Sequence, residues 1–135
     1  MSASNPLHGT LLFHLNLCFS AIEERDREEV QRRCYRPLLG LLERLPSLRL
    51  AIEASGYTLE CIQRMDPAWI RALRQWIAEG RVELVGSGDS QLIGPLVCPE
   101  VNRWNQRLGQ ATYGQLLDVS PSVALVNEMA WSQGI

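Results

Sequence analysis

Short apolar or alternating runs lie along the chain, and longer segments with helical periodicity separate them. The short runs predict four strands, at residues 9–19, 48–54, 81–86 and 122–128. The longer segments predict helices, at residues 26–45, 58–65, 67–79 with a C-cap at 80, and 99–116. Because strands that alternate with helices form parallel sheets with right-handed crossovers, this order predicts an α/β fold built from parallel β/α units.

Local features mark where the predicted helices begin, bend and end. Pro37 lies inside the first helix, so we expect a kink or a restart there. Asp66 and Pro67 are an N-cap followed by a proline at the first helical position, and Gly80 suits the C-terminal end of the same helix. The last helix carries its apolar positions at Val101, Trp104, Leu108, Ala111 and Leu116.

Composition narrows the class of protein. All 13 basic residues are arginines interleaved with acids, and the net charge is -2, so no basic stripe predicts nucleic-acid binding. The 4 cysteines form no CxxC pair, so a structural zinc site is not indicated. No signal peptide and no apolar run of about 20 residues is found, so we expect no membrane association and a cytoplasmic protein. Residues 1–8 are expected to form a flexible tail.

Polar side chains follow each predicted strand at its carboxyl end. They are His14 and Asn16, then Glu53, then Ser87, Asp89 and Gln91, and finally Asn127 and Glu128. Because the carboxyl ends of parallel strands meet at one edge of a sheet, we expect these side chains to line one site. Taken singly, His14, Glu53 and Asp89 also have structural explanations, as a hydrogen-bonded core residue, a partner of an arginine and a turn residue. Glu128 directly follows an apolar run, where a carboxylate is costly unless it is paired or functional.

Three segments together resemble glycoside hydrolase family 57. Residues 13–17 (Phe-His-Leu-Asn-Leu) resemble its first motif, although many members have His-Gln-Pro where this chain has His-Leu-Asn. Residues 81–88, with Gln91 and Pro95, resemble its second region, and residues 123–131 resemble the segment that carries the nucleophile. The resemblance extends over most of the chain from residue 11 onward.

The resemblance implies a retaining glycosidase or glucanotransferase that acts on α-glucans. The implied fold is a distorted seven-stranded (β/α) barrel, of which residues 9–135 would be the N-terminal portion, about half. Glu128 would be the nucleophile and His14 would line a sugar subsite. The remaining substrate contacts would be Asn16, Glu53, Ser87, Asp89, Gln91 and Asn127. The acid/base of the family is an aspartate on a later strand, so it is expected beyond Ile135 and this chain alone is expected to be inactive.

The expected partner is therefore a carbohydrate, with no cofactor and no metal. Unpaired strand edges predict association into a homo-oligomer. Two alternatives remain open. One is a metal-dependent hydrolase similar to polysaccharide deacetylases, although His14, Asn16 and Asp89 would be a poor zinc set. The other is a small non-catalytic α/β module that binds a carbohydrate or a protein.

Overall fold

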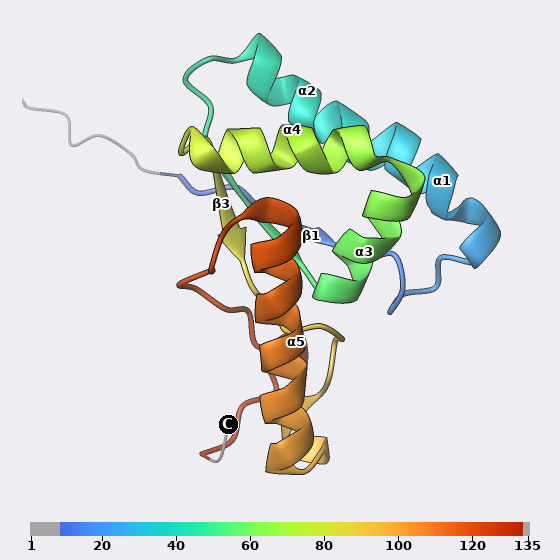
Figure 1. The fold of residues 1–135 in the computed structure, drawn as a ribbon, viewed down its shortest axis with the longest axis vertical. Coiled ribbons are helices and arrows are strands. Elements are labelled where there is room, and N and C mark those ends of the chain that lie inside the picture. The colour runs from blue at the N-terminus through green and yellow to red at the C-terminus, as the bar shows by residue number, and fades with distance from the viewer. Residues whose placement is uncertain (1–8, 134–135) are drawn as a thin grey trace, which may run out of the picture.

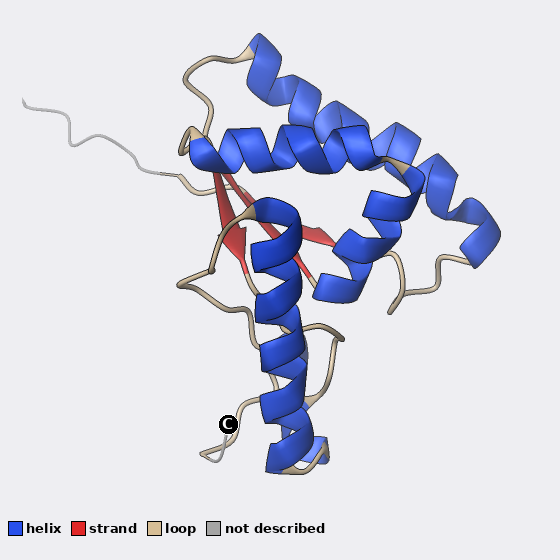
Figure 2. Cartoon of the chain, viewed as in Figure 1, coloured by secondary structure: helices blue, strands red, loops and turns tan. Residues whose placement is uncertain are grey.

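A three-stranded parallel sheet forms the centre of the fold. The structure is a computed structural model that describes residues 9–133, so the predicted tail at residues 1–8 lies outside the described residues. Strands β1 (Leu12–Leu15), β2 (Leu50–Ala54) and β3 (Val82–Val85) are ordered β1-β2-β3, and Figure 2 shows them side by side among the helices. Both pairings are parallel, so the predicted parallel β/α units are confirmed.

The helices cover the sheet and contact one another. They are α1 (Arg27–Val30), a π-helical segment Gln31–Tyr35, α2 (Arg36–Arg44), α3 (Gly56–Met65), α4 (Pro67–Ala78) and α5 (Pro99–Leu117). Helix α4 packs against α2, α3, α5 and β3, and α5 runs along the long axis of the molecule (Figure 1). Short 3₁₀ turns lie at Glu24–Asp26, Gly94–Leu96 and Asn127–Met129. Among the described residues, no helix is long and apolar enough to cross a membrane.

The local sequence explains the helix ends. Asp66 accepts a hydrogen bond from the Trp69 N–H at 3.2 Å, and Pro67 follows as the first residue of α4. Gly80 adopts a left-handed φ of 67° just after α4, as expected of a C-terminal glycine. Ser55 accepts a hydrogen bond from the backbone of Thr58, so α3 begins at Gly56, earlier than predicted.

The predicted irregularity at Pro37 takes the form of the π-helical segment that directly precedes α2. A proline has no N–H to donate to the preceding turn, and a π-helical turn is one way to accommodate that loss. The chain therefore remains helical through this region instead of breaking.

The hydrophobic core lies around the central strand. Every residue of β2 is buried. The side chains packed around it come from the strands, from the loop after β1 and from helices α2, α3, α4 and α5, and include Leu17, Leu42, Leu59, Ile62 and Leu73, each at most 1% exposed. Burial on both faces matches the apolar character of β2 and leaves Glu53 as its one ionisable residue.

The apolar positions of α5 do not define its buried face. Trp104 is 61% exposed and Leu108 is 51% exposed, whereas Asn105, Gly109 and Tyr113 are buried. The reason is a close backbone approach: a Cβ added at Gly109 would lie 2.5 Å from the carbonyl carbon of Gly88. Only a glycine fits this contact, so it fixes the rotation of the helix and turns the larger apolar residues outward.

The predicted fourth strand is wrong as a buried strand. The segment forms a single parallel bridge between Gly86 and Ala124, with hydrogen bonds from Gly86 N–H to Val123 O (2.9 Å) and from Leu125 N–H to Gly86 O (2.7 Å). Val123 is 48% exposed and Val126 is 39% exposed. Within residues 9–133 the segment has a neighbour on one side only, so neither a ladder nor burial on two faces develops.

Candidate active site at the carboxyl ends of the strands

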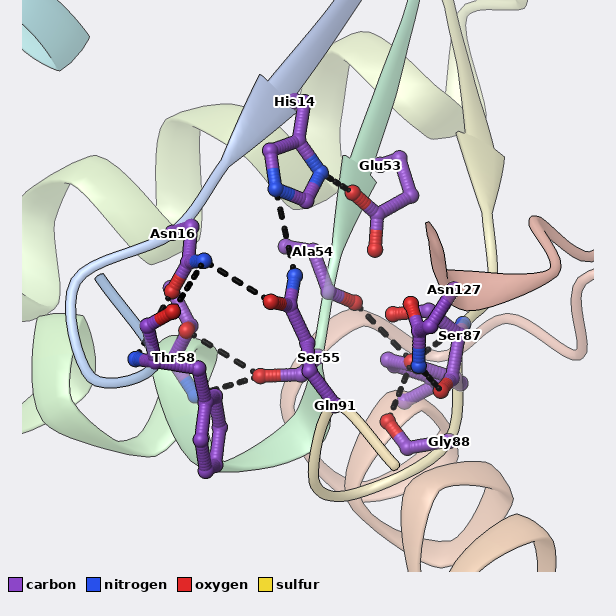
Figure 3. A network of polar contacts seen from close by, with 12 residues as sticks. His14, Asn16, Glu53, Ala54, Ser55, Thr58, Ser87, Gly88, Gln91 and Asn127 are labelled. Carbon is purple, nitrogen blue, oxygen red and sulfur yellow. Dashed lines mark hydrogen bonds and ion pairs between the residues drawn. The ribbon is translucent and has the colours of Figure 1, made fainter. Parts of the chain in front are cut away.

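Neighbouring strands bring His14 and Glu53 together. The two residues are register partners on β1 and β2, and His14 Nδ1 is hydrogen-bonded to Glu53 Oε2 (Figure 3). Glu53 is fully buried, whereas the side chain of His14 is 46% exposed. A buried carboxylate needs a partner, and the imidazole supplies it. Glu53 therefore lies behind His14, and its contact with the carboxyl edge of the sheet is the hydrogen bond to that imidazole.

The loop after β3 reaches back to β1 and completes a polar cluster. Gln91 Nε2 lies 3.2 Å from His14 Nε2, and Gln91 Oε1 accepts a hydrogen bond of 2.8 Å from Asn16 Nδ2. Asn16 also bonds the backbone of Phe19. Figure 3 shows His14, Asn16, Glu53 and Gln91 facing one another, and we refer to these four residues as the rim cluster. The predicted convergence of strand-end residues is thus found for these four positions.

Tyr113 holds the ends of β2 and β3 together, and sequence reasoning did not identify it. Its hydroxyl oxygen accepts from the Ser87 N–H at 3.1 Å, and the carbonyl oxygens of Ala54 and Gly88 each lie 2.9 Å away as acceptors. Burial raises the pKa of Tyr113, so the hydroxyl stays protonated at neutral pH. A single tyrosine in a helical segment carries no sequence signal for such a role.

Ser87 and Asn127 lie near each other beside this tyrosine. Asn127 Nδ2 donates to the carbonyl oxygens of Leu92 (3.3 Å) and Ser87 (3.5 Å). A cavity of about 210 Å³ is lined in part by Ser87, Asn102, Leu125 and Asn127. The Ser87 hydroxyl is buried and has no hydrogen-bond partner within the described residues.

Among the described residues, Asp89 and Glu128 form no hydrogen bond with the side chains of the rim cluster. Asp89 packs at the start of α3, where its carboxylate would be 2.8 Å from a Cβ on Gly56, and its carbonyl accepts from the Tyr57 N–H at 3.0 Å. Glu128 is exposed in the turn after Asn127 and has a left-handed backbone, with φ 55° and ψ 18°. A non-glycine residue in this region costs on the order of 1–3 kcal/mol, and such residues cluster at functional sites.

The residues after the strands offer hydrogen-bonding side chains in the rim cluster and one exposed carboxylate, that of Glu128. Within residues 9–133, no group of three or more His, Cys, Asp or Glu side chains is placed to hold a metal ion. The metal-dependent alternative therefore finds no ligand set in the part of the chain that the structure describes.

Comparison with known proteins places the chain in a family of carbohydrate-active enzymes. The sequence model of glycosyl hydrolase family 57 matches residues 13–135, and the chain belongs to this family. The alpha-amylase of Pyrococcus furiosus is 39% identical over 61 residues, which cover 45% of this chain and 9% of that protein. The 4-alpha-glucanotransferase of Thermococcus litoralis is 36% identical over 61 residues, with the same shares covered. The chain thus spans a small part of the length of these relatives.

Solved structures show the same arrangement of elements. The crystal structure of 4-alpha-glucanotransferase from Thermococcus litoralis matches 91% of this chain and 19% of its own, with a TM-score of 0.78 and 23% identity. The alpha-amylase AmyC from Thermotoga maritima matches 85% of this chain and 34% of its own, with a TM-score of 0.69 and 14% identity. The parallel β/α units therefore form part of a family 57 (β/α) barrel.

Proposed function

We propose that this chain provides the first β/α units of a retaining enzyme that hydrolyses or transfers α-glucans. The observation that carries the proposal is the rim cluster, in which side chains from β1, β2 and the loop after β3 meet at the carboxyl edge of the sheet. This edge is where (β/α) barrels bind and convert their substrates. Membership of family 57 supplies the substrate class, since curated members of similar sequence are an alpha-amylase and a 4-alpha-glucanotransferase.

In this proposal Glu128 is the nucleophile. Its carboxylate oxygen bonds to the anomeric carbon as the glycosidic C–O bond breaks, and the departing oxygen takes a proton from a second carboxyl group. Water then reverses these steps, or a second sugar hydroxyl takes the place of water in transfer. Two observations support Glu128: its side chain is open to solvent, and its backbone adopts the costly left-handed conformation.

In this proposal the second carboxyl group comes from outside the described residues. Retaining enzymes hold the two carboxyl groups about 5 Å apart. Glu53 is fully buried and paired with His14, and Asp89 packs at the start of α3. We therefore propose that the acid lies beyond Ile135, and that this chain alone does not turn over a natural glucan.

A glucosyl fluoride tests the role of Glu128 without the missing acid, because fluoride leaves unprotonated. The reagent is 5-fluoro-α-glucosyl fluoride, whose ring fluorine slows release of the covalent intermediate. Mass spectrometry of digested protein should find one fluoroglucosyl group on the peptide that contains Glu128. The Glu128→Gln variant should remain unlabelled, and Glu100→Gln, which alters an exposed glutamate on α5, should still be labelled. Absence of the label from the parent chain, or its persistence in Glu128→Gln, would refute the assignment.

A further inference from the structure

The rim cluster is a chain of hydrogen bonds whose direction is fixed at one end by the backbone. Asn16 Oδ1 accepts from the Phe19 N–H at 2.9 Å, and Asn16 Nδ2 donates to the Phe19 carbonyl at 3.1 Å. A backbone N–H can only donate and a carbonyl can only accept. The orientation of the Asn16 amide is therefore set by two backbone groups of known polarity.

The orientation of the Asn16 amide determines that of the Gln91 amide, and so determines which nitrogen of His14 carries the hydrogen. Because Asn16 presents Nδ2, Gln91 must present its oxygen to Asn16, at 2.8 Å. The nitrogen of the Gln91 amide is then the atom 3.2 Å from His14 Nε2, so Gln91 donates and the imidazole nitrogen accepts. Since His14 Nε2 has no hydrogen, Nδ1 carries it and donates it to Glu53 Oε2.

We propose that Asn16 and Gln91 are positioning residues that hold His14 in the tautomer protonated at Nδ1. This inference rests on the function proposed above, and it states which group donates and which accepts in the contact between His14 and the substrate. His14 Nε2 offers a lone pair at the rim, and it accepts a hydrogen bond from a sugar hydroxyl. The Gln91 amide occupies the place of that hydroxyl in the structure, and a bound sugar displaces it. The Asn16 amide bonds Phe19 and Gln91, so the role assigned to it here is to orient Gln91.

The tautomer can be measured without any sugar, so the result is independent of whether the site binds a glucan. Imidazole ¹H–¹⁵N correlation spectra of ¹⁵N-labelled chain distinguish a ring nitrogen that carries hydrogen from one that does not. The chain has 2 histidines, and the His8→Gln variant leaves the signals of His14 alone. At neutral pH the parent should show a protonated Nδ1 and an unprotonated Nε2.

Replacing one NH₂ group by oxygen should reverse the chain of hydrogen bonds. In Asn16→Asp the carboxylate still accepts from the Phe19 N–H but cannot donate, so Gln91 turns its NH₂ toward it and its oxygen toward His14. His14 Nε2 should then carry hydrogen, and its ¹⁵N signal should move from the unprotonated to the protonated region. A role confined to structure would leave the tautomer unchanged.

The matched control is Asn127→Asp, which adds the same charge at the same rim, at a residue whose amide donates to the carbonyl groups of Ser87 and Leu92 and does not contact Gln91. Its His14 Nε2 should stay unprotonated. If Asn16→Asp does not fold, Gln91→Glu makes the same prediction, because its carboxylate can only accept. The proposal is overturned if the parent carries hydrogen on Nε2, if the folded variant leaves Nε2 bare, or if Asn127→Asp protonates Nε2 as well.

Discussion

Removing the hydroxyl of Tyr113 should loosen the rim while leaving the core packed. The ring of Tyr113 is 1% exposed, so Tyr113→Phe keeps its apolar contacts. The lost oxygen is the acceptor for the Ser87 N–H, and the lost hydrogen is shared by the carbonyls of Ala54 and Gly88. The substitution thus removes the hydrogen bonds that join the ends of β2 and β3 to α5.

The magnitude follows from what remains unpaired. A buried donor left without a partner costs about 1–3 kcal/mol, and a lost intramolecular hydrogen bond costs about 0.5–1.5 kcal/mol more. We expect Tyr113→Phe to lower the free energy of unfolding by about 2–4 kcal/mol, a large part of the 5–15 kcal/mol typical of a domain.

Urea unfolding followed by tryptophan fluorescence measures this difference. The matched control is Tyr57→Phe, which removes the same atom from a tyrosine that is 39% exposed and whose ring lies against that of Phe19 at an angle of 56°. The control should change stability by less than about 0.5 kcal/mol. If the two variants unfold at the same urea concentration, the hydroxyl of Tyr113 does not tie the rim together and the reasoning is wrong.

Further outcomes follow from backbone contacts, burial and open edges. Gly109→Ala should destabilise by about 1–3 kcal/mol, because the new methyl meets the backbone of Gly88, whereas Gly114→Ala on the same helix has open space and should stabilise by up to about 1 kcal/mol, as urea unfolding would show. Burial raises the pKa of Tyr35 to about 12, so above the unfolded pKa of about 10 the folded state binds more protons than the unfolded state. The free energy of unfolding should therefore fall by up to about 3 kcal/mol as the pH rises toward 12, and it should fall less in Tyr35→Phe. Within the described residues β1 pairs only with β2, so light scattering at micromolar concentration should give a mass above that of the monomer, and a monomer would refute this expectation.

The periodicity of the sequence predicted the sheet because its strands are local features. The run that forms β2 is apolar except for Glu53, and the residues that follow it form an N-cap and a helix. In a parallel sheet the carboxyl ends of the strands lie at one edge, and this rule predicted that His14, Glu53 and Gln91 meet there. The prediction requires only the order of the strands and their parallel direction.

What the sequence could not predict depends on contacts between distant segments. The rotation of α5 is set by the approach of Gly109 to Gly88, and no pattern within the helix reports this approach. The run around Ala124 has the composition of a buried strand, but its pairing requires neighbours on both sides, and the described residues supply Gly86 alone. The hydrogen bonds through Asn16 depend on its contact with Gln91, 75 residues later in the chain, which sequence spacing does not reveal.

Titration of the labelled chain with a linear α-1,4-linked glucose oligomer tests most directly whether this rim binds a glucan. The account predicts that the ring nitrogen signals of His14 and the side-chain amide signals of Gln91 shift together and saturate as the sugar is added. The side-chain amide signals of Gln75, which bonds Glu79 at the end of α4, should stay in place, and a β-1,4-linked oligomer of equal length should produce little change. Unchanged His14 and Gln91 signals at millimolar sugar, or an equal response to both oligomers, would contradict the account.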